Sequence, residues 1–302
     1  MSAFAPPGDL PARHGFRAMG TSVELLGPAG HLSFTTAADA VTERFRREEM
    51  RFSRFRDDSE LHRVNTSAGA WTPASTTFLE VVALALDAAR RTEGRVDPTV
   101  LAAVVAAGYD RDFDDLVAGA RSVLRPAPRC GRWRAVERRP GEIRLPRGVG
   151  LDLGGIAKGW TVDRAAGDAV AAGLPWALVN AGGDLRLLNP VGAGAALEIS
   201  IEDPDASDRE LLRLRLSSGA LATSSTSRRS WGPGLHHLID PGTGRPAATG
   251  IVQATAWAPT CVDAEVLAKD IVLRGERVPA TPAVVVDDGD EVSVTFPEGA
   301  AA

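Results

Sequence analysis

The chain has little cysteine and no excess of basic charge, and both shortages exclude classes of protein. Its only cysteines, Cys130 and Cys261, lie far apart in the sequence and form no C-x-x-C motif. This spacing argues against a disulfide framework and against a thiolate zinc site. The formal net charge of −5 gives the chain no basic footprint, which argues against nucleic acid as a partner.

Long apolar runs and the common catalytic motifs are also missing. No stretch of about 18 apolar residues occurs, so the sequence predicts no membrane span. The first residues, MSAFAPPGDLPARHGF, have neither the basic nor the apolar part of a secretory signal, and no cysteine for a lipid anchor. We therefore expect a cytoplasmic protein. The motifs of P-loop enzymes, zinc proteases and α/β-hydrolases do not occur either.

Helical and strand patterns alternate along the chain without a shift in composition. This predicts one domain over residues 1–302 of the α+β class, with mixed, largely antiparallel sheets and packed helices. Residues 1–15 are expected to form a flexible N-terminus, and the arginine- and proline-rich tract 121–140 is a possible insertion. The expected helices are 35–50, 78–91, 99–107, one that follows Lys158, and 262–274. The expected strands are 16–26 with an interruption at Gly20, 132–137, 143–145, 176–179, 197–201, 211–216, 235–239 and a final hairpin from 283.

The most informative segment runs from Leu151 to Asp184. It contains LDLGGIAKGWTVD and later VNAGGD, so two apolar segments each run into a pair of glycines. We expect two strand ends to present backbone N–H groups at one edge of a sheet. Lys158 adds a cation beside the start of a helix. Glycine-rich backbone, a helix start and a cation together favour a phosphate site.

Three further segments carry side chains that could do chemistry. Asp97 stands before Pro98, and an aspartate in such a turn is more often an Asx cap for the following helix. His237 opens HLIDPGTGRP, where it would present an imidazole suited to proton transfer at a rim, although a plain surface pair with His236 is the alternative. On a strand only one of these two histidines would line a site. The run TSSTSRR at 223–229 could bind phosphate or be a polar loop.

Taken in order, these segments resemble the FAD:protein FMN transferases, the ApbE-type flavin transferases. The likeness covers nearly the whole chain, and each motif is weak alone. The motifs are AMGT at 18–21, FSRFRDDSELHRVN at 52–65, EGRVDPT at 93–99, LDLGGIAKGWTVD at 151–163, VNAGGD at 179–184, ATS at 222–224, HLIDPGTGRP at 237–246 and APTCVDAEVLAK at 258–269.

The resemblance implies an enzyme and two partners. Members of the family take FAD as substrate, move its FMN half onto a threonine or serine hydroxyl of an acceptor protein, and release AMP. Lys158 would then neutralise phosphate charge and His237 would take the hydroxyl proton, which makes both candidates for catalysis. The positions that match the family's flavin and cofactor contacts are Met19, Phe55, Arg95, Val96, Asp97, Gly154, Lys158, Trp160, Thr223 and Ile239. Phe55 stands where the family commonly has tyrosine, so the ring is retained.

At the metal site the chain departs from the family. Members usually hold Mg²⁺ with a backbone carbonyl, which matches Ala157, and with an Asp and a Thr on the last helix, where this chain has Glu265 and Lys269. We expect Mg²⁺ binding to be weakened but retained; the alternative is that Lys269 replaces part of the cation's electrostatic role. Three functions stay open: an active flavin transferase, an enzyme that hydrolyses FAD to FMN and AMP, and a non-catalytic FAD-binding protein.

Overall fold

The computed structural model describes residues 1–4, 10–116, 130–190, 196–206, 209–276, 278 and 281–295. The helices are α1 (Phe34–Phe52), α2 (Glu60–Thr66), α3 (Thr76–Arg91), α4 (Leu101–Ala106), α5 (Ala157–Ala171) and α6 (Cys261–Arg274), with short 3₁₀ turns η1 (Phe113–Asp115) and η2 (Trp133–Ala135). Within the described part, no helix is both long and apolar enough to cross a membrane.

The strands form one large antiparallel sheet and several small ones. They are β1 (Ser2–Phe4), β2 (Ala12–Ala18), β3 (Thr21–Gly27), β4 (Trp71–Pro73), β5 (Glu137–Arg139), β6 (Glu142–Arg144), β7 (Ala177–Ala181), β8 (Asp184–Leu188), β9 (Leu197–Glu202), β10 (Glu210–Leu216), β11 (Gly219–Ser225), β12 (Ser230–Gly232), β13 (Leu235–His236), β14 (Ile239–Asp240), β15 (Arg245–Pro246), β16 (Ile251–Ala258), β17 (Ala283–Asp287) and β18 (Val292–Thr295). The large sheet has the order β18-β17-β16-β11-β8-β7-β3-β2. The expectation of mixed, largely antiparallel sheets with packed helices is thus confirmed.

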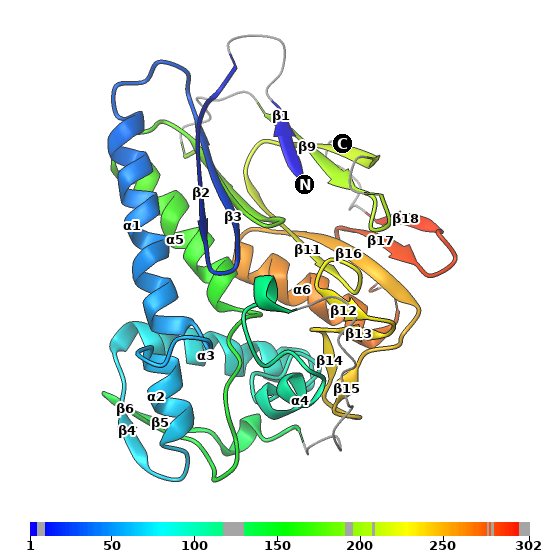
Figure 1. Cartoon of the computed structure of the whole chain (residues 1–302). Coiled ribbons are helices and arrows are strands. Elements are labelled where there is room, and N and C mark those ends of the chain that lie inside the picture. The colour runs from blue at the N-terminus through cyan, green and yellow to red at the C-terminus, as the bar shows by residue number, and fades with distance from the viewer. Residues whose placement is uncertain are drawn as a thin grey trace.

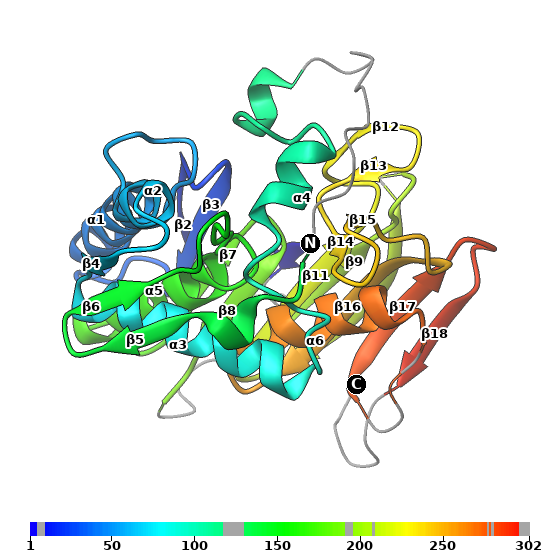
Figure 2. The ribbon, with the colours of Figure 1, turned by 90° about the horizontal axis from the view of Figure 1, so that it is seen from below.

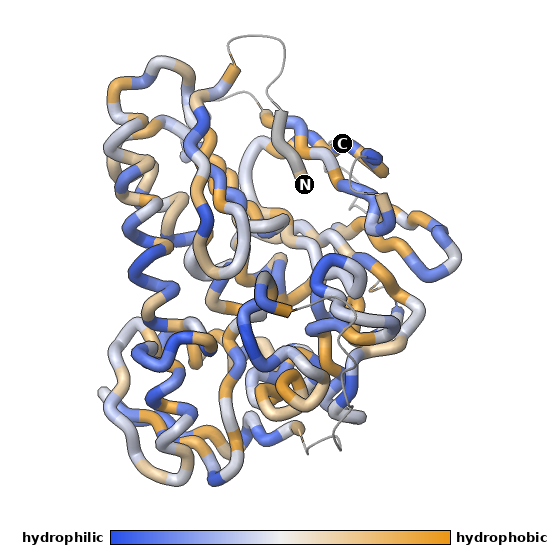
Figure 3. Tube along the Cα trace, in the orientation of Figure 1, coloured by the Kyte–Doolittle hydropathy of each residue, from blue (hydrophilic) through white to orange (hydrophobic). Residues whose placement is uncertain are grey.

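Helices α1, α5 and α6 cover the large sheet, with α1 and α5 side by side (Figure 1). Figure 3 shows hydrophilic positions spread along α1, while its inner face buries Val41 and Phe45 against α5. Sequence signals at both ends set the bounds of α6. The Thr260 hydroxyl accepts from the Asp263 N–H at 3.2 Å as an N-cap, and Gly275 ends the helix in the left-handed conformation with φ 73°.

A second part of the chain packs below the large sheet in Figure 1. It holds α2, α3, α4 and the small sheet β4-β6-β5, and its buried cluster around Phe78 and Ile143 extends to residues of α5 and α6 such as Trp160 and Val266. The view from below in Figure 2 sets α4 close to the strands β12 to β15. Residues of α4, such as Val104, pack with Ile239 of β14, so this contact joins the two parts of the chain. The candidate active site adjoins this contact, because Val104 and Ile239 both line its first cavity.

Several sequence expectations differ from the structure. The strand expected over 16–26 is a hairpin, because Met19 and Gly20 both take positive φ (52° and 67°) and turn the chain between β2 and β3. Residues 12–15, expected to belong to a flexible N-terminus, pair with β3. Residues 151–153 form no strand. In the tract 121–140, residues 121–129 lie outside the described part, and the rest forms η2 and β5.

Candidate active site

Two adjoining cavities share residues of the segment that leads into α5. The first is lined by the β2–β3 turn, the segment after α1, residues 95–100 and the segment 152–158 that leads into α5. The second is more polar and opens beside the β7–β8 turn and β11. Six residues line both cavities and so form their junction, here called the junction residues: Gly20, Gly154, Lys158, Arg229, His237 and Lys269.

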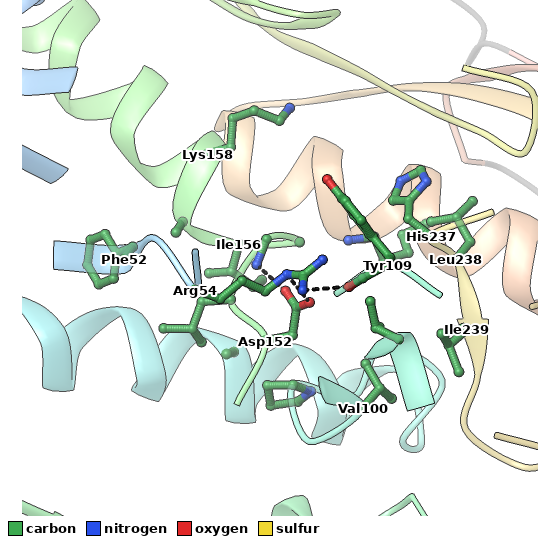
Figure 4. Close-up of a pocket in the computed structure, with 18 of the residues that line it drawn as sticks. Phe52, Arg54, Val100, Tyr109, Asp152, Ile156, Lys158, His237, Leu238 and Ile239 are labelled. Carbon is green, nitrogen blue, oxygen red and sulfur yellow. Dashed lines mark hydrogen bonds and ion pairs between the residues drawn. The ribbon is translucent and has the colours of Figure 1, made fainter. Parts of the chain in front are cut away.

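Aromatic rings and one guanidinium build the wall of the first cavity. The Tyr109 ring lies against Phe55 and Trp231, with centroids 5.6 and 5.3 Å apart. The Arg54 guanidinium lies over the rings of Phe55 and Tyr109, at 4.1 and 4.2 Å, and donates to the Tyr109 carbonyl at 2.8 Å. Figure 4 shows Arg54 also pairing with Asp152, at 3.4 Å, and the Tyr109 hydroxyl pointing toward the region between Lys158 and His237.

The segment around Asp97 is held in place by its own polar groups. One carboxylate oxygen of Asp97 accepts from the Thr99 N–H at 2.7 Å, and the other accepts from the Gly131 N–H at 2.7 Å. This is the Asx turn that the sequence offered as the alternative to a functional role. Asp97 and its neighbours Val96 and Arg95 nevertheless line the first cavity. Arg95 donates to Asp270 at 2.6 Å through Nε.

The glycine N–H groups expected to receive phosphate already have partners within the protein. The Gly154 N–H donates to the Asp152 carboxylate at 2.8 Å. The Gly182 N–H donates to the Ser22 carbonyl at 3.1 Å, and the Gly183 N–H donates to the Asn180 side chain at 3.1 Å. The prediction that these two glycine turns present bare backbone donors is therefore wrong at these three positions. The positive charge at the junction therefore comes from the side chains of Lys158, Arg229 and Lys269.

Lys158 lies where the sequence places it, at the start of α5, and pairs with Asp184 at the start of β8. Its ammonium also donates to the Ala181 carbonyl at 3.4 Å. Burial is the main cause that lowers the pKa of Lys158 to about 8, while the negative charge of Glu265 opposes the shift. The ammonium therefore keeps most of its charge at neutral pH.

Helices α5 and α6 cap each other with carboxylates. Glu265 of α6 is buried and accepts from the Gly159 N–H, in the first turn of α5, at 3.1 Å. In return, Asp163 of α5 accepts from the N–H groups of Cys261 and Val262 at 2.8 and 3.1 Å. An anionic side chain at a helix N-terminus is favourable for both helices. Glu265 therefore has a structural role before any ligand is considered.

Only one of the two adjacent histidines lines the cavities, as the alternation along a strand predicts. His236 is buried, accepts from the Leu238 N–H at 3.3 Å and contacts the Ala247 carbonyl through Nε2 at 3.0 Å. His237 lines both cavities, and its buried Nδ1 has no hydrogen-bond partner among the described residues. Burial, and then the charges of Arg229 and Lys269, lower the pKa of His237 well below 6.5. Its imidazole is thus neutral at pH 7.

The remaining predicted contacts fall into two groups. Met19, Phe55 and Ile239 line the first cavity, and Thr223 lines the second, where its hydroxyl lies 2.8 Å from that of Thr255. Trp160 lines neither cavity. It is 4% exposed, its Nε1 donates to Glu80 at 3.1 Å, and its ring packs against Phe52 in the core.

The lining residues that sequence reasoning missed include Arg54, Tyr109 and Arg229. Arg54 lies inside the FSRFR segment, and Tyr109 is the single tyrosine of the chain, but neither spacing nor charge sets them apart. Arg229 belongs to the TSSTSRR run, for which a polar loop was the more frequent alternative. In the structure Thr223 to Ser225 end β11, Arg229 reaches the junction, and Arg228 instead pairs with Glu202 on the surface.

Comparison with known proteins identifies the family. A family model described as the ApbE family matches residues 19–283. The chain belongs to the ApbE family. Two FAD:protein FMN transferases, from Vibrio cholerae and Treponema pallidum, are each 31% identical, over 78% and 77% of this chain and 76% and 69% of their own lengths.

Solved structures of ApbE proteins have the same fold. The ApbE protein of Thermotoga maritima is 25% identical, with a TM-score of 0.83 over 94% of this chain and 97% of its own. The flavin transferase ApbE of Vibrio cholerae is 26% identical, with a TM-score of 0.73 over 93% of this chain and 96% of its own. The α+β fold expected from the resemblance is therefore confirmed.

Proposed function

We propose that this chain is an FAD:protein FMN transferase, which moves FMN from FAD to a threonine or serine hydroxyl of an acceptor protein and releases AMP. Its ApbE relatives carry that name. The observation that carries the proposal is the junction between the aromatic cavity and the polar one. The cations of Lys158, Arg229 and Lys269 and the neutral imidazole of His237 all line this junction. FAD is the substrate, and a cytoplasmic location stays a prediction.

The first cavity suits the isoalloxazine ring. Its lining combines the rings of Phe55 and Tyr109 with the apolar side chain of Ile239. Two buried guanidinium nitrogens, Nη2 of Arg54 and Nη2 of Arg95, have no acceptor among the described residues. A buried donor without a partner costs free energy, and the carbonyl oxygens of the flavin ring are acceptors of the right kind. We assign both arginines to recognition of the ring.

The junction suits the pyrophosphate. Lys158, Arg229 and Lys269 bring positive charge to a place where the N–H groups of Gly154 and Gly183 already donate to side chains of the protein. Charge on the phosphates grows at the leaving AMP as the bridging P–O bond breaks, so fixed cations stabilise this stage most. The proposal therefore relies on side chains rather than on the glycine backbone.

His237 is assigned as the general base. Its imidazole is neutral, and Nδ1 has no protein partner among the described residues, so this nitrogen can accept a proton. The acceptor hydroxyl oxygen forms a bond to the phosphorus on the riboflavin side. The bridging P–O bond breaks, AMP leaves with that electron pair, and the hydroxyl proton moves to His237. Atoms and charges balance without a further reactant.

The residues do not fit a magnesium ion. At the implied ligand positions, Lys269 is a cation and offers no lone pair while charged. The Ala157 carbonyl accepts from the Thr161 hydroxyl at 2.7 Å, and one oxygen of Glu265 accepts from the Gly159 N–H. No group of three or more His, Cys, Asp or Glu residues in the described ranges could hold a metal. Mg²⁺ prefers an octahedral set of oxygens, and these residues do not provide one. The proposed reaction therefore uses no metal ion.

Two other functions have the same FAD site, and one experiment separates all three. Purified protein is incubated with FAD and a peptide pool that carries one fixed threonine between randomised positions. A matched pool has alanine in its place. We expect AMP release with the threonine pool and an FMN adduct on its peptides. Equal AMP release with both pools indicates FAD hydrolysis, and tight FAD binding without AMP in either pool indicates a non-catalytic binding protein.

A further inference from the structure

Lysine is used in only two places in this chain. Of the 34 basic residues counted as lysine or arginine, only Lys158 and Lys269 are lysines, and all the others are arginines. Lys158 starts α5 and Lys269 lies near the end of α6, more than a hundred residues later. Both nevertheless line the junction of the two cavities. A chain that uses arginine elsewhere thus places both of its lysine side chains at the junction.

The ammonium of Lys269 lies directly against the backbone at Gly155. A Cβ atom built at position 155 would clash with Lys269 Nζ, so any larger residue there would push the flexible end of this lysine away from its place. A planar guanidinium is larger than an ammonium, which makes arginine a poor substitute in this space. The side chain is half-buried, and its charge is near enough to help lower the pKa values of His237 and Lys158.

Lys269 has no ion-pair partner in the part of the chain that the structure describes. Among the described residues, no carboxylate lies within ion-pair distance of its Nζ, although Glu265 is one turn earlier on the same helix. Glu265 bonds to the first turn of α5 instead, and Asp184 pairs with Lys158. Arg229 adds a third positive charge, and its guanidinium donates to the Gly20 carbonyl at 3.3 Å. Clustered like charges in a partly buried site are unfavourable unless an anion joins them.

We propose that Lys269 takes the place of the divalent cation and that this chain transfers FMN without a metal. The inference rests on the proposed function and assigns to Lys269 the stabilisation of negative charge on the phosphates. Lys269 neutralises the pyrophosphate when FAD binds and stabilises the negative charge that AMP gains as the bridging P–O bond breaks. The hydroxyl proton still moves to His237, so no additional reactant is needed.

Binding experiments test the proposal without any turnover. Full-length protein is treated with EDTA, and the affinities for FAD and riboflavin are measured with and without added Mg²⁺. We expect the same FAD affinity in both conditions. Lys269→Met should weaken FAD binding about ten-fold or more, as the loss of a charged hydrogen bond implies, and leave riboflavin binding nearly unchanged. Arg46→Met, which removes an exposed cation of α1 that lines neither cavity, is the control and should change neither affinity.

The two lysines allow a second, independent readout. An amine-acetylating reagent is applied to EDTA-treated protein, and the modification of Lys269 is followed by mass spectrometry. FAD should protect Lys269 and riboflavin should not. Mg²⁺ that tightens FAD binding ten-fold, an unchanged FAD affinity in Lys269→Met, or equal acetylation of Lys269 with FAD and riboflavin would each overturn the proposal.

Turnover then separates this inference from the proposed function. We expect equal AMP release in EDTA and in Mg²⁺ with the threonine pool, and a loss of about 10²–10³-fold in Lys269→Met. AMP release that requires Mg²⁺ would leave the transferase function intact and refute the role of Lys269. No AMP release in either condition would refute the transferase function, while the binding and protection experiments still decide whether Lys269 binds the pyrophosphate.

Discussion

Gly159 allows the first turn of α5 to pack directly against α6, and alanine at this position tests that packing. A Cβ here would lie 2.8 Å from Glu265 Oε2 and 3.0 and 3.1 Å from the carbonyl oxygen and carbon of Cys261. The carboxylate could rotate away, but the Cys261 atoms are backbone, so α6 itself must move. Overpacking of this kind costs about 1–3 kcal/mol. We therefore expect Gly159→Ala to lower the free energy of unfolding by about that amount.

The same helix provides the matched control. Gly167 also lies in α5, and a Cβ there would meet nothing within 4 Å. Alanine favours a helix interior over glycine by up to about 1 kcal/mol, so Gly167→Ala should raise stability. Urea unfolding of the two variants and the parent, compared at equal m values, measures both effects. A midpoint for Gly159→Ala equal to or above that of Gly167→Ala would refute the close packing of α5 on α6.

Four further outcomes follow from the site. AMP release should stay constant as pH falls from neutral to 6.5, because the low pKa of His237 keeps its imidazole unprotonated; a rate that halves near 6.5 contradicts this. FAD affinity of the free protein should fall above about pH 8 as Lys158 loses its proton. Trp160→Phe should cost about 1.5–3 kcal/mol of stability by loss of the bond to the Glu80 carboxylate, with FAD affinity unchanged in a fluorescence titration. Arg54→Met should weaken binding of FAD and riboflavin alike, since it acts on the ring; an effect on FAD alone would be inconsistent.

Helices were predictable from the sequence where apolar residues recur on one face. The helix expected over 78–91 is α3 (Thr76–Arg91), and that over 262–274 is α6. Two central strands of the large sheet, β11 and β16, were missed. The sequence of β11, GALATSS, is rich in small residues and lacks the β-branched and aromatic alternation that marks a strand. In β16, IVQATAWA, three alanines interrupt that alternation.

The candidate site was predictable only where a motif carried it. Lys158 and His237 lie at the junction because the segments that hold them are the most distinctive of the chain. The glycine turns were misjudged because Asp152 and Asn180, each within three residues, fold back onto the N–H groups. The alternative of a plain surface pair does not describe His236, which is buried and whose two hydrogen bonds predict a loss of about 1–3 kcal/mol in stability on substitution by alanine.

The fate of solvent oxygen tests most directly whether a hydroxyl of an acceptor attacks FAD. The reaction with the threonine pool is run in oxygen-18 water, and AMP, FMN and the FMN–peptide are examined by mass spectrometry. Transfer to the threonine predicts that neither AMP nor the FMN–peptide carries the label, because the new P–O bond takes its oxygen from the peptide. Label in free FMN would show that water is the nucleophile, which would contradict the transferase function.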